Sequence, residues 1–258
     1  MSSEPEISTR PQLQLIIRSL LRADGIMLFK GRRSLILSIA LPIILLVISD
    51  KGKLTNNVGG GRFIVGLCIC YGLMSTALMG YSVLTAQDRE RGVFQRLRVT
   101  PAPTWAIMVS RLAVRLLASL IIALVVVIVG SQMHKLKLGF GSYVLVLAVS
   151  VLAGAVFLSI GQALVGLVRS ADTVNAAARI LYIALIFLGV LGLSGGLGAT
   201  FETISKWTPV GITMTLFAGV MKLSAWGARD SESILAAVGY VVVFTAIGVR
   251  WFQWDSRQ

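Results

Sequence analysis

Six apolar blocks divide the chain, separated by short polar stretches. They occupy residues 35–49, 63–86, 112–130, 143–168, 180–195 and 233–251. Most approach the roughly 20 residues that cross a bilayer as one helix. Because lipid offers no hydrogen-bond partners, each block must satisfy its own backbone, and these lengths suit helices rather than the ~10-residue alternating strands of a barrel. The pattern therefore predicts an all-α, polytopic membrane protein with six transmembrane helices.

Two further stretches contain many apolar residues without forming a span. One is apolar on one side only, and the other is too short to cross the membrane. Residues 11–33 combine apolar positions at helical spacing with a separate stripe formed by Gln14, Arg18 and Arg22, which predicts an amphipathic helix along the inner membrane surface. That helix is either a simple anchor or a face that meets a cytoplasmic partner. Residues 207–221 are apolar, short and broken by Pro209, which predicts a re-entrant segment before the last span. We therefore expect a cytoplasmic tail and amphipathic helix at 1–33, then one six-span domain at 34–258.

Composition agrees with a membrane protein and excludes several other classes. Hydrophobic residues make up 56% of the 258, and charged residues only 14%, well below a soluble domain. With the N-terminus inside, sixteen of the 24 Lys and Arg residues fall on the cytoplasmic side. This positive-inside bias predicts a multi-pass protein of the plasma (inner) membrane with both termini cytoplasmic. It also accounts for the net charge of +13 through membrane lipid, without nucleic acid.

The sequence offers little catalytic chemistry. No GxxxxGK[ST] stretch is present to cradle ATP phosphates, and the eleven acidic residues fall in tails, loops or span ends. Arg111 and Arg115 enter the third block only at its inner end, where we expect them to snorkel to the surface. His134 is expected in a solvated outer loop, and Cys68 and Cys70 point to different sides of one helix. We therefore expect no cofactor or metal in this chain and no enzyme activity of its own.

The strongest local signal follows the second block, in the run QDRERGVFQRLRVTP at residues 87–101. Charges alternate in sign before Gly92, which permits a bend. Residues 93–99 can form a short amphipathic helix with Phe94 and Leu97 on one face, and Pro101 then ends it. Together these features predict a rigid cytoplasmic knob. The other interpretation is a solvated, positively charged loop.

The run DRERGVFQRLRVTP resembles the signature of the ABC type-2 permease family, the membrane subunits of ATP-binding-cassette exporters, in which a Glu-Arg-rich, glycine-containing stretch leads to a Leu-x-Val-Thr-Pro ending. The likeness covers nearly the whole chain. Asp88 stands where a glutamate is common, and Val93 where threonine often follows the glycine. The resemblance implies that residues 11–33 are the connecting helix and 93–99 the coupling helix.

By the same resemblance, both helices dock on a separate ATPase subunit that binds ATP and Mg, and a second permease subunit, identical or paralogous, completes the transporter. Closure of the ATPases on ATP would then drive alternating access. The implied coupling residues are Asp88, Arg89, Glu90, Arg91, Gly92, Phe94, Arg96, Leu97, Arg98, Thr100 and Pro101, with Gln14, Arg18 and Arg22 on the connecting helix.

The second block suggests where cargo could pass. On a regular helix Tyr71, Ser75, Ser82 and Thr85 share an arc of about 80°. These side chains either line a substrate path or form interhelical hydrogen bonds. An otherwise apolar interior favours amphipathic or hydrophobic cargo, drug-like or lipid-linked. A non-transporting membrane adaptor or sensor is the alternative function, and it would need no ATP turnover in its partner.

Overall fold

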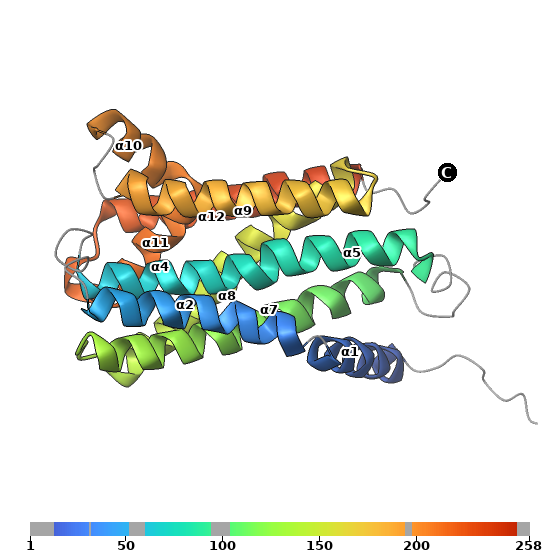
Figure 1. Cartoon of the computed structure of the whole chain (residues 1–258), viewed down its shortest axis with the longest axis horizontal. Helices are drawn as coiled ribbons and strands as arrows, with labels where there is room; N and C mark the ends of the chain where they lie inside the picture. The colour runs from blue at the N-terminus through green and yellow to red at the C-terminus, as the bar shows by residue number, and fades with distance from the viewer. Residues whose placement is uncertain (1–12, 31, 52–59, 94–103, 194–197, 252–258) are drawn as a thin grey trace, which may run out of the picture.

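The computed structural model describes residues 13–30, 32–51, 60–93, 104–193 and 198–251, and every regular element within these ranges is a helix (Figure 1). In chain order these are α1 (Leu13–Lys30), α2 (Arg32–Lys51), α4 (Gly61–Leu73), the π-helix η1 (Met74–Gly80), α5 (Tyr81–Glu90), α7 (Thr104–Met133), α8 (Phe140–Leu167), α9 (Ala171–Leu193), α10 (Ala199–Trp207), α11 (Pro209–Val220), the 3₁₀ turn η2 (Leu223–Ala225) and α12 (Ala228–Arg250).

Five helical stretches of the described chain are long and apolar enough to cross a membrane. They are Gly61–Glu90, Val109–Met133, Phe140–Leu167, Ala171–Leu191 and Ala228–Arg250. The predicted all-helical, multi-pass class is confirmed. The first predicted block lies in α2, which continues through Pro42, but its described apolar stretch, Ser38–Ser49, is shorter than the other five.

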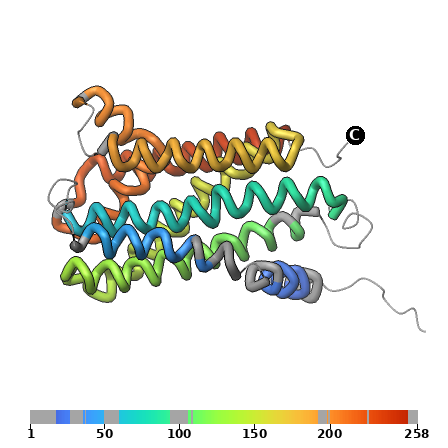
Figure 2. The backbone as a smooth tube through the Cα atoms, in the orientation of Figure 1, coloured from blue at the N-terminus to red at the C-terminus, as the bar shows by residue number. Residues whose placement is uncertain are grey.

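The stretch Gly61–Glu90 is the central helix of the bundle, formed by α4, η1 and α5 in one continuous run. In Figure 2 it runs along the middle of the molecule, with α9 on one side and α2 and α7 on the other. Its most apolar window is 78% buried, whereas that of α12 is 17% buried, although both have a mean hydropathy of 1.9. Hydropathy therefore identifies the spans but does not distinguish the centre of the bundle from its rim.

The middle of the central helix is a π-helix, which the sequence pattern does not predict. Hydroxyl groups on η1 bond to two neighbours: Ser75 Oγ lies 2.7 Å from Ser38 Oγ on α2, and Thr76 Oγ1 lies 2.9 Å from Ser119 Oγ on α7. A π-helix holds more residues per turn than an α-helix and is common at functional sites. It therefore shifts the faces of α5 relative to those of α4.

The segment predicted to be re-entrant forms the buried helix α11. Thr208 caps it, accepting a hydrogen bond on Oγ1 from the backbone N–H of Gly211 at 3.2 Å, and Pro209 occupies its first turn. α11 packs against α4, where Thr213 Oγ1 lies 3.2 Å from Cys70 Sγ. The cap satisfies the Gly211 amide, which as a first-turn N–H has no intrahelical acceptor.

His134 differs from expectation. It is half-buried at the end of α7, and its Nε2 lies within hydrogen-bond distance of Ser49 Oγ, at 3.3 Å. His134 does lie in the turn after α7, as expected, but it is not fully solvated, because α2 contacts α7 and Gly61 at the start of α4 lies against the ring.

Candidate functional site

The last turn of α5 carries three consecutive charged residues, and each binds a different helix. Asp88 contacts α7, Arg89 contacts the end of α8, and Glu90 contacts the beginning of α9. The turn therefore holds three helices to the end of the central helix. We call Asp88, Arg89 and Glu90 the three-helix tie.

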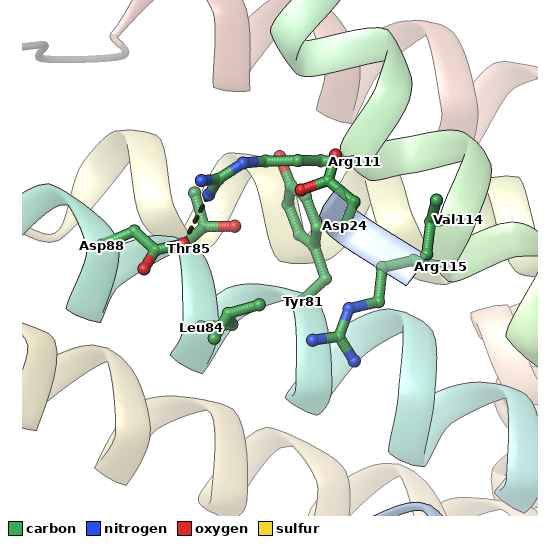
Figure 3. Close-up of a pocket in the computed structure, with 8 residues that line it drawn as sticks. All are labelled: Asp24, Tyr81, Leu84, Thr85, Asp88, Arg111, Val114 and Arg115. Atoms are coloured by element: carbon green, nitrogen blue, oxygen red, sulfur yellow. Dashed lines mark hydrogen bonds and ion pairs between the residues drawn. The ribbon is translucent and has the colours of Figure 1, made fainter. Parts of the chain in front are cut away.

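Asp88 and Arg111 form a buried ion pair between α5 and α7 (Figure 3). Arg111 Nη1 donates to Asp88 Oδ2 at 2.6 Å, and the two side chains are 9% and 5% exposed. The expectation that Arg111 snorkels to the surface is therefore wrong. A charge buried at this depth is tolerated because the opposite charge is buried beside it.

Arg89 binds the C-terminal end of α8. Its guanidinium donates to the backbone carbonyls of Val165, Val168 and Arg169, at 2.8, 2.7 and 2.5 Å. The last carbonyls of a helix lack intrahelical partners and carry its negative dipole end, so a buried cation is favourable there. Arg89 thus fixes both the end of α8 and the turn that leads to α9.

Glu90 binds the N-terminal end of α9. Its Oε1 accepts a hydrogen bond from the backbone N–H of Ala171, the first residue of that helix, at 2.5 Å. First-turn amides lack intrahelical acceptors and favour a negative charge. Arg89 and Glu90 therefore bind the negative end of one helix and the positive end of the next.

Beyond the tie, the backbone bends at Gly92. Arg91 is exposed, and Gly92 has a φ of +67°, a left-handed conformation that favours glycine. The bend expected at Gly92 is thus present. The rest of the predicted coupling segment, Phe94, Arg96, Leu97, Arg98, Thr100 and Pro101, lies outside the described residues.

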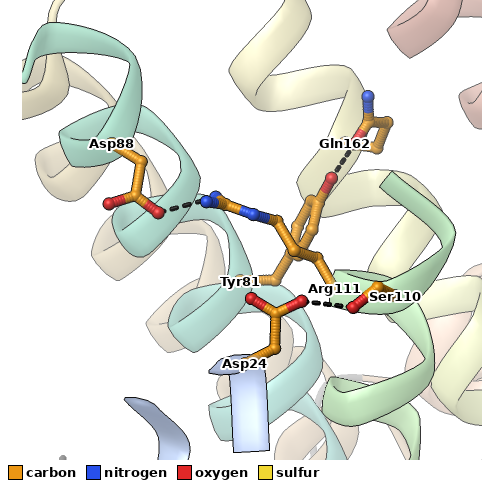
Figure 4. Close-up of polar contacts among 6 residues, drawn as sticks. All are labelled: Asp24, Tyr81, Asp88, Ser110, Arg111 and Gln162. Carbon is orange, nitrogen blue, oxygen red and sulfur yellow. Dashed lines mark hydrogen bonds and ion pairs between the residues drawn. The ribbon is translucent and has the colours of Figure 1, made fainter. Parts of the chain in front are cut away.

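A helix, α1, is present where the connecting helix is predicted, and it packs on α7. Arg18 and Arg22 are exposed, and of Gln14 only the backbone is described. Asp24 accepts a hydrogen bond from Ser110 on α7 (Figure 4). Burial raises the pKa of the Asp24 carboxyl above its ordinary value, and the hydrogen bond from Ser110 opposes that shift.

The four hydroxyl-bearing residues proposed for a substrate path have different neighbours. Tyr71 donates to the carbonyl of Ile186 on α9 at 3.2 Å, and Ser75 bonds to α2. Ser82 lies against α8, 3.3 Å from the carbonyl of Gly161. Thr85 lines a pocket near α1 and α7. The π-helix η1 departs from the regular helical spacing that the predicted arc assumed. Three of the four residues make interhelical hydrogen bonds, and the substrate path stays a prediction.

Comparison with known proteins adds the family. The chain matches the family described as ABC-2 type transporter over residues 16–222, which is most of its length. The chain belongs to the ABC-2 type transporter family. It is also 22% identical, over 182 residues, to the "Putative transport permease YvfS" of Bacillus subtilis (strain 168), covering 67% of this chain and 70% of that protein. The predicted resemblance is confirmed, and the protein is a membrane transport subunit.

The region that matches the ABC-2 transporters includes all the partners of the three-helix tie, from Asp88 to Ala171. Within this ABC-2 transporter, no group of three or more His, Cys, Asp or Glu side chains in the described ranges could hold a metal ion. What the structure shows at the site is hydrogen bonds and an ion pair that connect α5 to α7, α8 and α9.

The sequence analysis missed two residues of this ABC-2 transporter that bond near the C-terminal end of the central helix. Ser110 and Gln162 bind Asp24 and Tyr81, respectively (Figure 4). In the sequence, these residues are recognisable only as polar positions within or near apolar blocks. That pattern does not show which helices the polar side chains connect.

Proposed function

We propose that this chain is the transmembrane permease subunit of an ATP-driven exporter. It moves an amphipathic or hydrophobic cargo, drug-like or lipid-linked, across the plasma membrane by alternating access. A separate ATP-binding-cassette ATPase, carrying ATP and Mg, supplies the energy, and a second permease subunit, identical or paralogous, completes the pathway. Membership of the ABC-2 family and the helical, multi-pass fold support this proposal.

The proposed topology has six spans, with α2 as the first and α11 as a re-entrant helix on the outer side. The length of α2, 20 residues, supports its inclusion. The excess of Lys and Arg in the segments at one end supports cytoplasmic termini.

The observation that carries the mechanism is the three-helix tie. Residues 93–99, the proposed coupling helix, follow the tie after the bend at Gly92. A force on that helix reaches α5 first and then α7, α8 and α9 through Asp88, Arg89 and Glu90. ATP binding in the partner would thereby favour one of two packings of the bundle.

Co-purification tests this proposal. The tagged full-length chain is isolated in mild detergent from its native membrane, copurifying proteins are identified, and ATP turnover is measured. Phe94→Arg places a charge on the apolar face of the proposed coupling helix, whereas Arg179→Gln removes an exposed inner-end charge away from the tie.

We expect an ATP-binding-cassette ATPase to accompany the wild-type chain and the Arg179→Gln control, and to be lost, or to lose stimulated turnover, with Phe94→Arg. If the chain is isolated alone or with a protein that does not hydrolyse ATP, the alternative of a non-transporting adaptor is favoured.

A further inference from the structure

A pocket at the inner end of the bundle is lined by a positively charged side chain, Arg115, that forms no hydrogen bond or ion pair with the three-helix tie. The pocket lies between α1, α5 and α7 (Figure 3), and its lining residues are Asp24, Tyr81, Leu84, Thr85, Asp88, Arg111, Val114 and Arg115. We propose that this pocket binds the anionic head group of an amphiphile, with Arg115 as its charged anchor.

Arg115 lies within the apolar stretch Val109–Met133, one helical turn further from its start than Arg111. Its guanidinium forms no ion pair or hydrogen bond with any side chain of the described chain. An arginine in a membrane-spanning helix is costly unless it faces a partner or a polar cavity. Here it faces the pocket.

The other charged groups of the pocket have partners. Arg111 is paired with Asp88, and Asp24 accepts a hydrogen bond from Ser110. Because Arg111 neutralises Asp88, the Arg115 guanidinium remains the group able to bind an incoming anion. Its planar fork suits two oxygens of a phosphate or carboxylate.

The surroundings of Arg115 suit an amphiphile better than a free ion. Leu84 and Val114 contribute apolar side chains to the lining of the same pocket. Opposite, at Gly80, an added Cβ would lie 3.1 Å from Arg115 Nη1, so the absence of a side chain there leaves room for the guanidinium. α1 closes the pocket on one side and exposes apolar residues such as Ile26 to its surroundings. An alkyl chain could therefore remain in the apolar layer while its head group reaches Arg115.

Asp24 opposes the same anion. When ionised, its carboxylate attracts the Arg115 guanidinium and repels an incoming oxyanion. Removing the charge at residue 24 should therefore strengthen binding, and removing the charge at residue 115 should weaken it. Two substitutions with opposite signs are a signature that general destabilisation would not produce.

The test uses the full-length chain in neutral detergent and needs neither ATPase nor transport, so its outcome is independent of the proposed function. Dodecyl phosphate is titrated while the apparent melting temperature is followed, with inorganic phosphate and dodecanol as probes of the head group alone and of the chain alone. We expect saturable stabilisation by dodecyl phosphate only.

Arg115→Gln should raise the half-saturating concentration about tenfold or more, because a charge-assisted contact is lost, and Asp24→Asn should lower it. The matched control Arg179→Gln should leave it unchanged. Equal binding to Arg115→Gln and wild type would overturn the site. If inorganic phosphate raised the melting temperature equally, the ligand would not need an alkyl chain. If dodecanol did so equally, the ligand would not need an anionic head group. If Arg115→Gln fails to fold, the Asp24→Asn titration still decides, since unchanged or weaker binding contradicts the proposal.

Discussion

Glu90, at the end of α5, caps the first amide of α9 at Ala171, 81 residues further along the chain. With Arg89 on the carbonyls that end α8, it makes the junction between α8 and α9 depend on the central helix. The charged run after the second apolar block therefore joins helices within the bundle and also precedes the segment that we propose to couple to an ATPase.

Removing the Glu90 cap should loosen the beginning of α9. For Glu90→Ala we expect a loss of about 1 kcal/mol in local stability, as for other helix caps, because the Ala171 amide loses its acceptor. Hydrogen exchange of the peptide covering residues 168–175 should accelerate about fivefold. Asp172→Ala removes an exposed first-turn acid of the same helix but leaves the cap, and it should accelerate exchange less than Glu90→Ala. Equal exchange in wild type and Glu90→Ala would show that the cap does not hold the helix.

The Asp88–Arg111 pair should show strong coupling. Asp88→Asn and Arg111→Met each leave one buried charge without its partner, at a cost of about 3 to 5 kcal/mol, while the double variant should be much less destabilised than the sum. Thermal unfolding of the four proteins measures this. The half-exposed pair Glu202–Lys206 on α10 provides the comparison, with coupling below about 1 kcal/mol. Additive losses at Asp88 and Arg111 would contradict the pairing.

Arg89 should not be replaceable by lysine. Its guanidinium reaches three carbonyls in fixed directions, and one ammonium group cannot reproduce that fork. We expect Arg89→Lys to cost about 1 to 3 kcal/mol in unfolding experiments. Arg91→Lys, on an exposed neighbour, should be neutral. A neutral Arg89→Lys would mean that charge alone is sufficient at the end of α8.

Docking of α1 should depend on pH through Asp24. Burial against α7 raises the pKa of this carboxyl from its ordinary 3.8, despite the hydrogen bond from Ser110; Arg111 and Arg115 also lower it, and Asp88 raises it. The docked state therefore holds the proton more tightly than the undocked state. The resulting stabilisation is fully present below the ordinary pKa and is lost as pH rises through the docked-state pKa.

Hydrogen exchange of α1 peptides, corrected for its intrinsic pH dependence, checks this between about pH 4 and 8. Protection in the wild type should fall with rising pH, and Asp24→Asn should remove that component. A pH response that survives in Asp24→Asn would assign it to another group.

Hydropathy was sufficient to predict a helical, multi-pass protein, because spanning a membrane imposes length and apolarity on each segment. It could not reveal that Arg111 turns inward, since its partner Asp88 comes from another helix and a single sequence does not show which helices are neighbours. The placement of polar residues on one arc also assumed regular α-helical spacing through Ser75, where the structure has a π-helix. The arc predicted for Tyr71, Ser75, Ser82 and Thr85 therefore rests on a spacing that residues 74–80 do not follow.

Photo-crosslinking in native membranes tests whether the segment that follows the three-helix tie binds an ATPase. A photoreactive phenylalanine analogue replaces Phe94, and a second protein carries it at Leu235, an exposed residue of α12. We expect a cross-link to an ATP-binding-cassette ATPase from residue 94 and none from residue 235. No ATPase adduct from residue 94, in a protein that still inserts and folds, would contradict it.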